Sequence, residues 1–184
     1  MTMIKYLLAA IVANLIMTGA TMSQDLENTL YLDSTHGRII IEMFPDHAPQ
    51  HVSRIKELTR QGFYDGLTFH RVIEGFMAQT GDPQGNGTGG SGQNLPAEFN
   101  DMPHLRGTVA MARAGHPDSA DSQFFICFEP AFHLDGQYTV WGRVVSGMEF
   151  VDQLKRGEGP GFTDPDQILK MQVAADAQTN EPAE

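Results

Sequence analysis

Apolar residues in this chain come in short runs that glycine, proline and small polar residues interrupt again and again. Nineteen glycines and ten prolines are spread along its 184 residues. Short apolar runs between such turn signals are typical of β-strands, and long helices do not tolerate this density of glycine and proline. The pattern therefore favours a β-rich fold of many short strands, and the length suits a single domain.

The expected elements are a hairpin, a helix, several strands, a second helix and a final strand. Residues 28–44 indicate the hairpin, and at 48–62 Val52, Ile55 and Leu58 recur at helical spacing. Further strands are expected at 67–73, 76–81, 107–113, 122–128, 137–145 and 165–173, and the second helix at 147–157. This order predicts an all-β dominated domain, a closed antiparallel barrel with helices over its ends. The domain spans 28–174, and the small polar residues that follow predict a flexible tail at 175–184.

The N-terminus has the pattern of a secretory signal. Lys5 precedes an apolar stretch at 6–17, and the small residues Thr18 and Ala20 follow it. We expect residues 1–20 to be a signal peptide that is cleaved near Ala20, which gives a periplasmic protein with no stable membrane insertion. The alternatives are an N-terminal helix that packs on the domain and an uncleaved anchor, although a span needs roughly twenty apolar residues.

Charge and cysteine content exclude several classes of function. The formal net charge is −11 and no cluster of lysine and arginine stands out, which argues against a nucleic-acid partner. The single cysteine, Cys127, rules out an intramolecular disulfide and a zinc site with several cysteines.

The glycine-rich segment at 85–92 lacks the Lys-Ser/Thr ending of a phosphate loop, so we interpret it as the wall of a groove.

The segment GLTFHRVIEGFMAQTGD, residues 66–82, places a cation among large apolar side chains. Arg71 lies close in sequence to Phe69, Val72, Phe76 and Met77. A buried arginine must be paired, because the desolvation of an unpaired charge is very costly. An arginine at the rim of an apolar pocket, in contrast, can direct its donors at a ligand. The simpler alternative is an arginine on a solvated strand face.

Alternation within SQFFICF, residues 122–128, separates two faces of one strand. Gln123, Phe125 and Cys127 share one face, and Phe124 and Ile126 lie on the other. We expect the first face to meet a ligand and the second to fill the core. Cys127 is interpreted as a buried residue rather than a reactive thiol.

Several ordered motifs resemble the cyclophilin family of peptidyl-prolyl isomerases. They are FHRVIEGFMAQTGD, GTGG, MARAG, SQFFICF and LDGQYTVWGRVVSGME, and the resemblance covers roughly residues 29–173. The chain is most similar to the short, exported bacterial branch. The resemblance implies an eight-stranded closed antiparallel barrel with two capping helices, and an isomerase that rotates X-Pro bonds to assist protein folding in the cell envelope.

The resemblance also implies the residues of the site. Arg71 takes the position of the catalytic arginine, and Gln79 that of the glutamine that supports it. The substrate would contact Phe76, Met77, Gln79, Gly87, Ala112, Arg113, Gln123, Phe125, His133, Leu134 and Tyr138. Four positions depart from the common pattern. His133 replaces the tryptophan of cyclosporin-sensitive members, Tyr138 a frequent histidine, Glu74 a frequent proline and Thr80 a frequent glycine.

The resemblance implies a function without cofactor or metal, in a monomer that binds proline-containing polypeptides and binds cyclosporin only weakly. A module that binds proline segments as a chaperone, with little catalysis, is the alternative. His70 beside Arg71 has a structural role in this interpretation, because the isomerisation moves no proton. A hydrolase built on His133 and Asp135 would lack a nucleophile motif.

Overall fold

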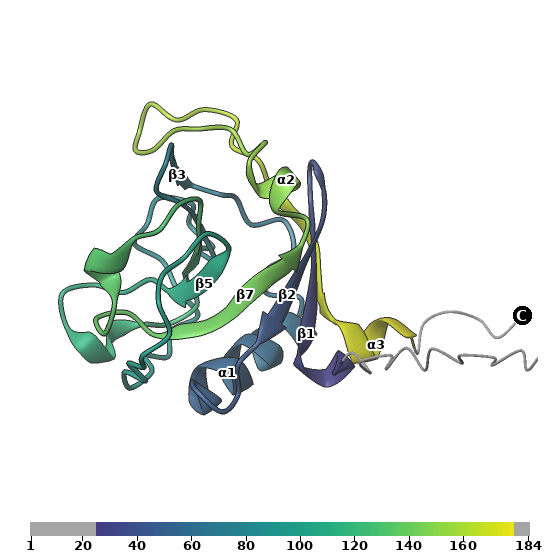
Figure 1. Cartoon of the computed structure of the whole chain (residues 1–184). Helices are drawn as coiled ribbons and strands as arrows, with labels where there is room; N and C mark the ends of the chain where they lie inside the picture. The colour runs from purple at the N-terminus through teal and green to yellow at the C-terminus, as the bar shows by residue number, and fades with distance from the viewer. Residues whose placement is uncertain (1–24, 179–184) are drawn as a thin grey trace, which may run out of the picture.

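In the computed structural model, which describes residues 25–178, eight strands form one curled antiparallel sheet (Figure 1). The strand order is β3-β4-β6-β5-β7-β2-β1-β8. The strands are β1 Thr29–Ser34, β2 Gly37–Met43, β3 Arg71–Ile73, β4 Met77–Thr80, β5 Thr108–Met111, β6 Phe124–Cys127, β7 Val140–Ser146 and β8 Ile168–Val173. The helices are α1 Pro49–Arg60, α2 Met148–Val151 and α3 Ala174–Gln178, and short 3-10 turns lie at Leu26–Asn28, Pro117–Ser119 and Phe132–Leu134. The expected signal peptide lies outside the described residues.

The sheet does not close into a barrel, so the eight strands are confirmed but the predicted closure was wrong. Between the edge strands β3 and β8 the structure has no ladder. The chain just before them makes one isolated bridge, Thr68 to Gln167, and Val72 of β3 bridges Gly157 of a loop instead. The free edge of β8 is partly covered, because the backbone N–H of Met171 donates to the Asp65 carboxylate at 2.9 Å. Such a side-chain acceptor protects an edge strand from further pairing.

Two apolar clusters lie on opposite faces of the sheet, and β6 contributes to both. Phe124 and Ile126 belong to the larger cluster, together with Trp141 and the predicted inner face of α1. Phe125 and Cys127 belong to a smaller cluster with Met77, Ala110, Ala131, Leu134 and Val140. The alternation predicted for residues 122–128 is therefore confirmed. Phe125 of the smaller cluster faces Gln79 of β4, which in turn faces Arg71 of β3, so this cluster lies on the same face of the sheet as Arg71.

The helices differ in length from the prediction. The second helix is only four residues long and follows Gly147, whose positive φ of 89° a larger residue would adopt only with strain. The predicted tail begins as helix α3, and Asp176 in it pairs with Arg60 of α1 at 2.9 Å. Arg60 also pairs with Glu27, so α1 ties the two ends of the domain together. No helix in the range 25–178 is long and apolar enough to cross a membrane.

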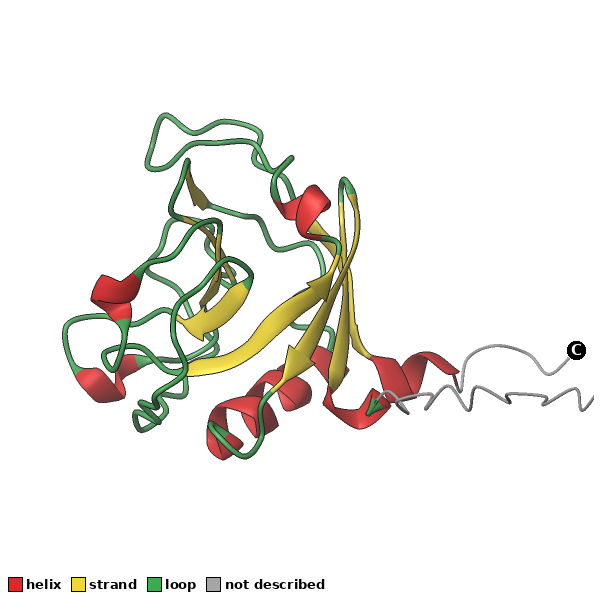
Figure 2. Ribbon diagram, viewed as in Figure 1, coloured by secondary structure: helices red, strands yellow, loops and turns green. Residues whose placement is uncertain are grey.

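Loops gather on the side of the molecule where β3 and β5 lie, while the long strands β1 and β2 lie on the side of α3 (Figures 1 and 2). Loops carry function more often than the scaffold that holds them. The predicted site residues lie on the short strands β3 to β6 and the loops that follow them.

Candidate active site

Arg71 is the first residue of β3 and lies directly across from Gln79 of β4. Its side chain is 39% exposed, so the guanidinium is at a rim and not inside the core. Nε donates to Oε2 of Glu158 at 2.8 Å, and Nη1 donates to Oε1 of Gln79 at 3.5 Å. The predicted support by Gln79 is thus present as a long hydrogen bond, whereas Glu158 was not predicted.

A relay of side-chain amides connects Arg71 with the glycine-rich loop. Nε2 of Gln79 donates to Oε1 of Gln123 at 2.8 Å. Nε2 of Gln123 in turn donates to the backbone carbonyls of Gly89 at 2.8 Å and Gly87 at 3.1 Å. Because each amide accepts at one end and donates at the other, the relay fixes the direction in which Gln79 presents its oxygen.

Two aspartates, which the sequence analysis did not single out, shape the glycine-rich loop. The Asp82 carboxylate accepts the backbone N–H groups of Gly87 at 2.6 Å, Gln84 at 2.8 Å and Asn86 at 3.0 Å. Burial alone would raise the pKa of Asp82, but these N–H donors outweigh it and the pKa is lowered. Asp121 accepts the N–H groups of Ser91, Gly92 and Gln93 in the same way. For Asp82 the available sequence signal was its place just before the glycine-rich turn, whereas Asp121 is distant in sequence and carries no such signal.

The loop and the ends of β4 and β5 enclose a groove of about 410 Å³. The structure brings five predicted residues together in its lining: Gln79, Gly87, Ala112, Arg113 and Gln123. The guanidinium of Arg113 lies 4.7 Å from the ring centre of Tyr138 and donates to the backbone carbonyls of Ala114 and Gln137. Tyr138 therefore holds Arg113 along the groove.

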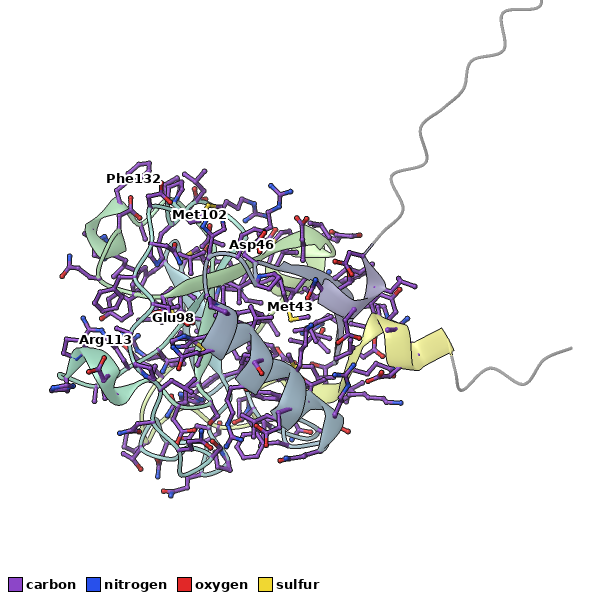
Figure 3. The ribbon with its side chains drawn as sticks, turned by 90° about the horizontal axis from the view of Figure 1, so that it is seen from below. Met43, Asp46, Glu98, Met102, Arg113 and Phe132 are labelled. Atoms are coloured by element: carbon purple, nitrogen blue, oxygen red, sulfur yellow. The ribbon has the colours of Figure 1, made fainter. Side chains whose placement is uncertain are left out.

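The predicted pocket residues Met77, Phe125 and Leu134 are brought together in the smaller cluster and are 1%, 4% and 8% exposed. Phe76 packs against this cluster and is only partly buried. The ring of His133, on an exposed residue, lies 5.7 Å from that of Phe76. The arrangement is an apolar floor with two ring systems at its edge. Figure 3 places Arg113 and Phe132, the residue before His133, at separate points on the side of the molecule remote from α3.

A buried histidine supports the floor from behind, and sequence reasoning missed it. His104 is fully buried and its ring stacks on Phe125 at 6.1 Å. Oδ1 of Asp135 lies 2.8 Å from Nδ1 of His104 and accepts its backbone N–H at 2.8 Å. These contacts with His104 lower the pKa of Asp135, the backbone N–H most of all. Asp135, considered above as a partner of His133, is thus a structural partner of His104, and no motif in the sequence signals this pairing.

The departures at Glu74 and Thr80 are both accommodated. The Thr80 hydroxyl donates to the backbone carbonyl of Thr68 at 2.9 Å, and Glu74 pairs with Arg156 at 2.5 Å.

Burial lowers the pKa of His70 and raises that of the Cys127 thiol to about 12, so neither group is charged at neutral pH. Within residues 25–178, no group of His, Cys, Asp and Glu is arranged to hold a metal ion.

Known proteins share this architecture and much of its sequence. A "probable peptidyl-prolyl cis-trans isomerase" of Brucella suis is 47% identical over 194 residues, which cover 96% of this chain and 99% of that protein. "Peptidyl-prolyl cis-trans isomerase B" of Bacillus subtilis is 47% identical over 123 residues, covering 66% and 85% of the two chains.

Solved structures of cyclophilins have the same fold as this chain. The cyclophilin AquaCyp293 from Hirschia baltica has a TM-score of 0.76 at 28% identity and covers 83% of this chain and 76% of its own. A Cryptosporidium parvum cyclophilin-type isomerase, solved in the presence of the dipeptide Ala-Pro, has a TM-score of 0.73 at 27% identity, with 79% and 98% covered. The family model for cyclophilin-type peptidyl-prolyl cis-trans isomerases matches residues 29–173, from the start of β1 to the end of β8. This chain therefore belongs to the cyclophilin family and is a peptidyl-prolyl cis-trans isomerase.

Proposed function

We propose that this isomerase acts on X-Pro bonds of polypeptides in the cell envelope and that Arg71 is its catalytic residue. One observation carries the assignment of Arg71. The guanidinium lies at the rim of an apolar floor, with its Nη1 held by Gln79 and much of its surface open. A fixed cation beside an apolar pocket suits a ligand that is an apolar ring carrying one basic atom.

The chemistry needs no covalent step. Rotation about an X-Pro bond has a barrier of about 18–20 kcal/mol, because the amide is conjugated. When the bond twists, the proline nitrogen becomes pyramidal and basic. A donor aimed at that nitrogen gains strength in the twisted state alone, which is the condition for catalysis. Arg71 supplies such a donor and stays protonated throughout.

The remaining site residues hold the substrate in this proposal. Phe76, Met77, Phe125 and Leu134 contact the proline ring, and the groove beside Arg113 takes the residues next to it. The glycine loop allows a second backbone to come close, since Gly87 carries no side chain. The Ala-Pro dipeptide used with the Cryptosporidium relative supports a proline-containing ligand for this chain.

Substitution of Arg71 tests the mechanism. We expect Arg71→Ala to lower kcat on a short X-Pro peptide by about 10²–10³, by analogy with oxyanion-hole donors, and to leave KM little changed. Arg71→Lys should not restore the rate, because a flexible ammonium cannot replace the planar fork held by Gln79. Circular dichroism checks that both variants are folded. A folded Arg71→Ala enzyme with normal kcat would show that the pocket alone catalyses.

The alternative function is that of a chaperone module. Such a protein would bind proline peptides with full affinity but isomerise them no faster than the Arg71→Ala variant. The same two measurements, peptide binding and kcat, separate the two functions. We also propose that the folded chain is a monomer, which sedimentation velocity measures directly.

The envelope location rests on the sequence pattern of residues 1–20. We expect the mature chain to begin near Thr21 and to be recovered from the periplasmic fraction. Intact-mass measurement of protein purified from cells decides the cleavage site. Full-length chain in the membrane fraction would indicate an uncleaved anchor, and full-length chain in the cytosol would contradict export.

A further inference from the structure

The loop that follows α2 lies against the outer edge of β3 (Figure 1), the strand that begins at Arg71. Val72 and Gly157 exchange two backbone hydrogen bonds, of 2.8 and 2.9 Å, in an isolated antiparallel bridge. In an antiparallel pair the residues on either side of the bridge also face each other. Arg71 therefore faces Glu158, and their side chains form the 2.8 Å ion pair.

A second ion pair of reversed polarity lies on the other side of the same bridge. Arg156 of the loop donates from Nε to Glu74, which follows β3, at 2.5 Å. Each strand of the bridge thus carries one acid and one base, and each base meets an acid of the other strand. These charges favour one register of the loop against β3, because a shift would bring like charges together.

The loop has a defined conformation at this point. A Cβ on Gly157 would collide with the ring of Phe162, so this ring packs directly on the Gly157 backbone. Gly159 has a positive φ of 72°, which makes the turn immediately after Glu158. The backbone N–H of Lys155 donates to the Asp166 carboxylate at 2.7 Å and fixes the other side. Glu158 is therefore presented to Arg71 by a built turn.

The guanidinium of Arg71 is held from two directions as a result. Glu158 engages Nε and Gln79 engages Nη1, and the part of the chain that the structure describes gives Nη2 no hydrogen bond. A planar group with a short hydrogen bond at one nitrogen and a longer one at a second has a restricted orientation and a free donor edge. We propose that Glu158 is a positioning residue that orients Arg71 so that this free edge meets the substrate, a role that rests on the proposed function of Arg71.

Stability alone does not explain the pair. Arg71 and Glu158 are 39% and 55% exposed, and they line a groove of about 700 Å³ that is open to solvent. Exposed ion pairs contribute little to the folded state. Orientation of a flexible arginine before the substrate arrives, in contrast, reduces the ordering that catalysis requires.

The test compares substitutions at the two ion pairs. We expect Glu158→Ala to lower kcat about 3–10-fold with KM changed less than about 2-fold, and Glu158→Gln, which keeps an acceptor oxygen, to fall between it and the parent. The matched control is Glu74→Ala, which removes the pair across the same bridge without touching Arg71, and it should keep the parental kcat. In an Arg71→Ala background, Glu158→Ala should have no further effect on kcat.

Three outcomes separate the positioning role of Glu158 from the proposed catalytic role of Arg71. A normal kcat in Glu158→Ala, beside a strongly reduced one in Arg71→Ala, would overturn the positioning role and leave the proposed function intact. An equal loss in Glu74→Ala would overturn it too, because the loop attachment and not Glu158 would then matter. A normal kcat in Arg71→Ala would refute the proposed mechanism and this inference together.

Discussion

Phe124 and Phe125 are adjacent in β6 but serve different clusters, and this predicts different consequences for the same substitution. Phe124 is fully buried between Tyr64 and Trp141, whose ring centres lie 5.6 and 5.4 Å away. Phe125 is 4% exposed and lies in the proposed proline pocket, against His104 and Tyr138. We therefore compare Phe124→Leu with Phe125→Leu.

Both substitutions replace a buried ring by a smaller apolar side chain. We expect each to cost about 1–2 kcal/mol of unfolding free energy, which lowers the Tm of a chain of this size by about 2–8 °C. Only Phe125→Leu removes surface that a bound proline would contact, so only this variant should raise KM, by about 3–10-fold.

Thermal unfolding followed by circular dichroism and steady-state kinetics on one X-Pro peptide measure both effects. The comparison is informative because the two variants lose the same atoms from neighbouring positions. An equal rise of KM in both would refute the assignment of the two faces. A KM for Phe125→Leu that matched the parent would show that this ring is core and not pocket.

Two further predictions concern the loop and the rim. Asp82→Asn should lower the unfolding free energy by about 1–3 kcal/mol at neutral pH, since it weakens the hydrogen bonds to the loop N–H groups. The pKa of Asp82 in the folded protein is lowered, so this stabilisation is complete above about pH 4 and is lost as the pH falls through that pKa. Denaturant titrations should therefore give unfolding free energies of the parent and Asp82→Asn that converge as the pH is lowered. His133→Trp should strengthen cyclosporin inhibition by about 10–100-fold, because an indole adds contact area and an N–H donor beside Phe76; equal inhibition of both forms would contradict this reason.

Most of the fold follows from local patterns. Strand alternation, the spacing of Val52, Ile55 and Leu58, and the positions of turn residues determine which face of each element is apolar, and the structure agrees. Barrel closure depends instead on whether the two edge strands are long enough to pair. β3 has only three residues, and no local pattern distinguishes a short edge strand from a longer one.

The site shows the same difference between features that local sequence determines and features that depend on contacts between distant residues. The residues on strands and in recognisable motifs, such as Arg71, Gln79 and Phe125, were predicted and lie close together. The residues that hold them in place were missed, because their partners are distant in sequence. Glu158 lies 87 positions from Arg71, and Asp135 lies 31 positions from His104. A lone acidic residue in a loop carries no signal that it will meet a particular base.

The incomplete closure of the sheet and the position of Arg71 are one feature of this molecule. In a continuous ladder, a regular strand would occupy the outer edge of β3 and its neighbours would cover the side chains there. Here a single bridge to Gly157 occupies that edge, and the turn behind it delivers Glu158 to one side of the guanidinium while Gln79 of β4 supplies the other. A short edge strand thus leaves an arginine exposed enough to reach a substrate, yet paired on both sides. For this reason we expect changes that lengthen the pairing of β3 to reduce activity even where they raise stability.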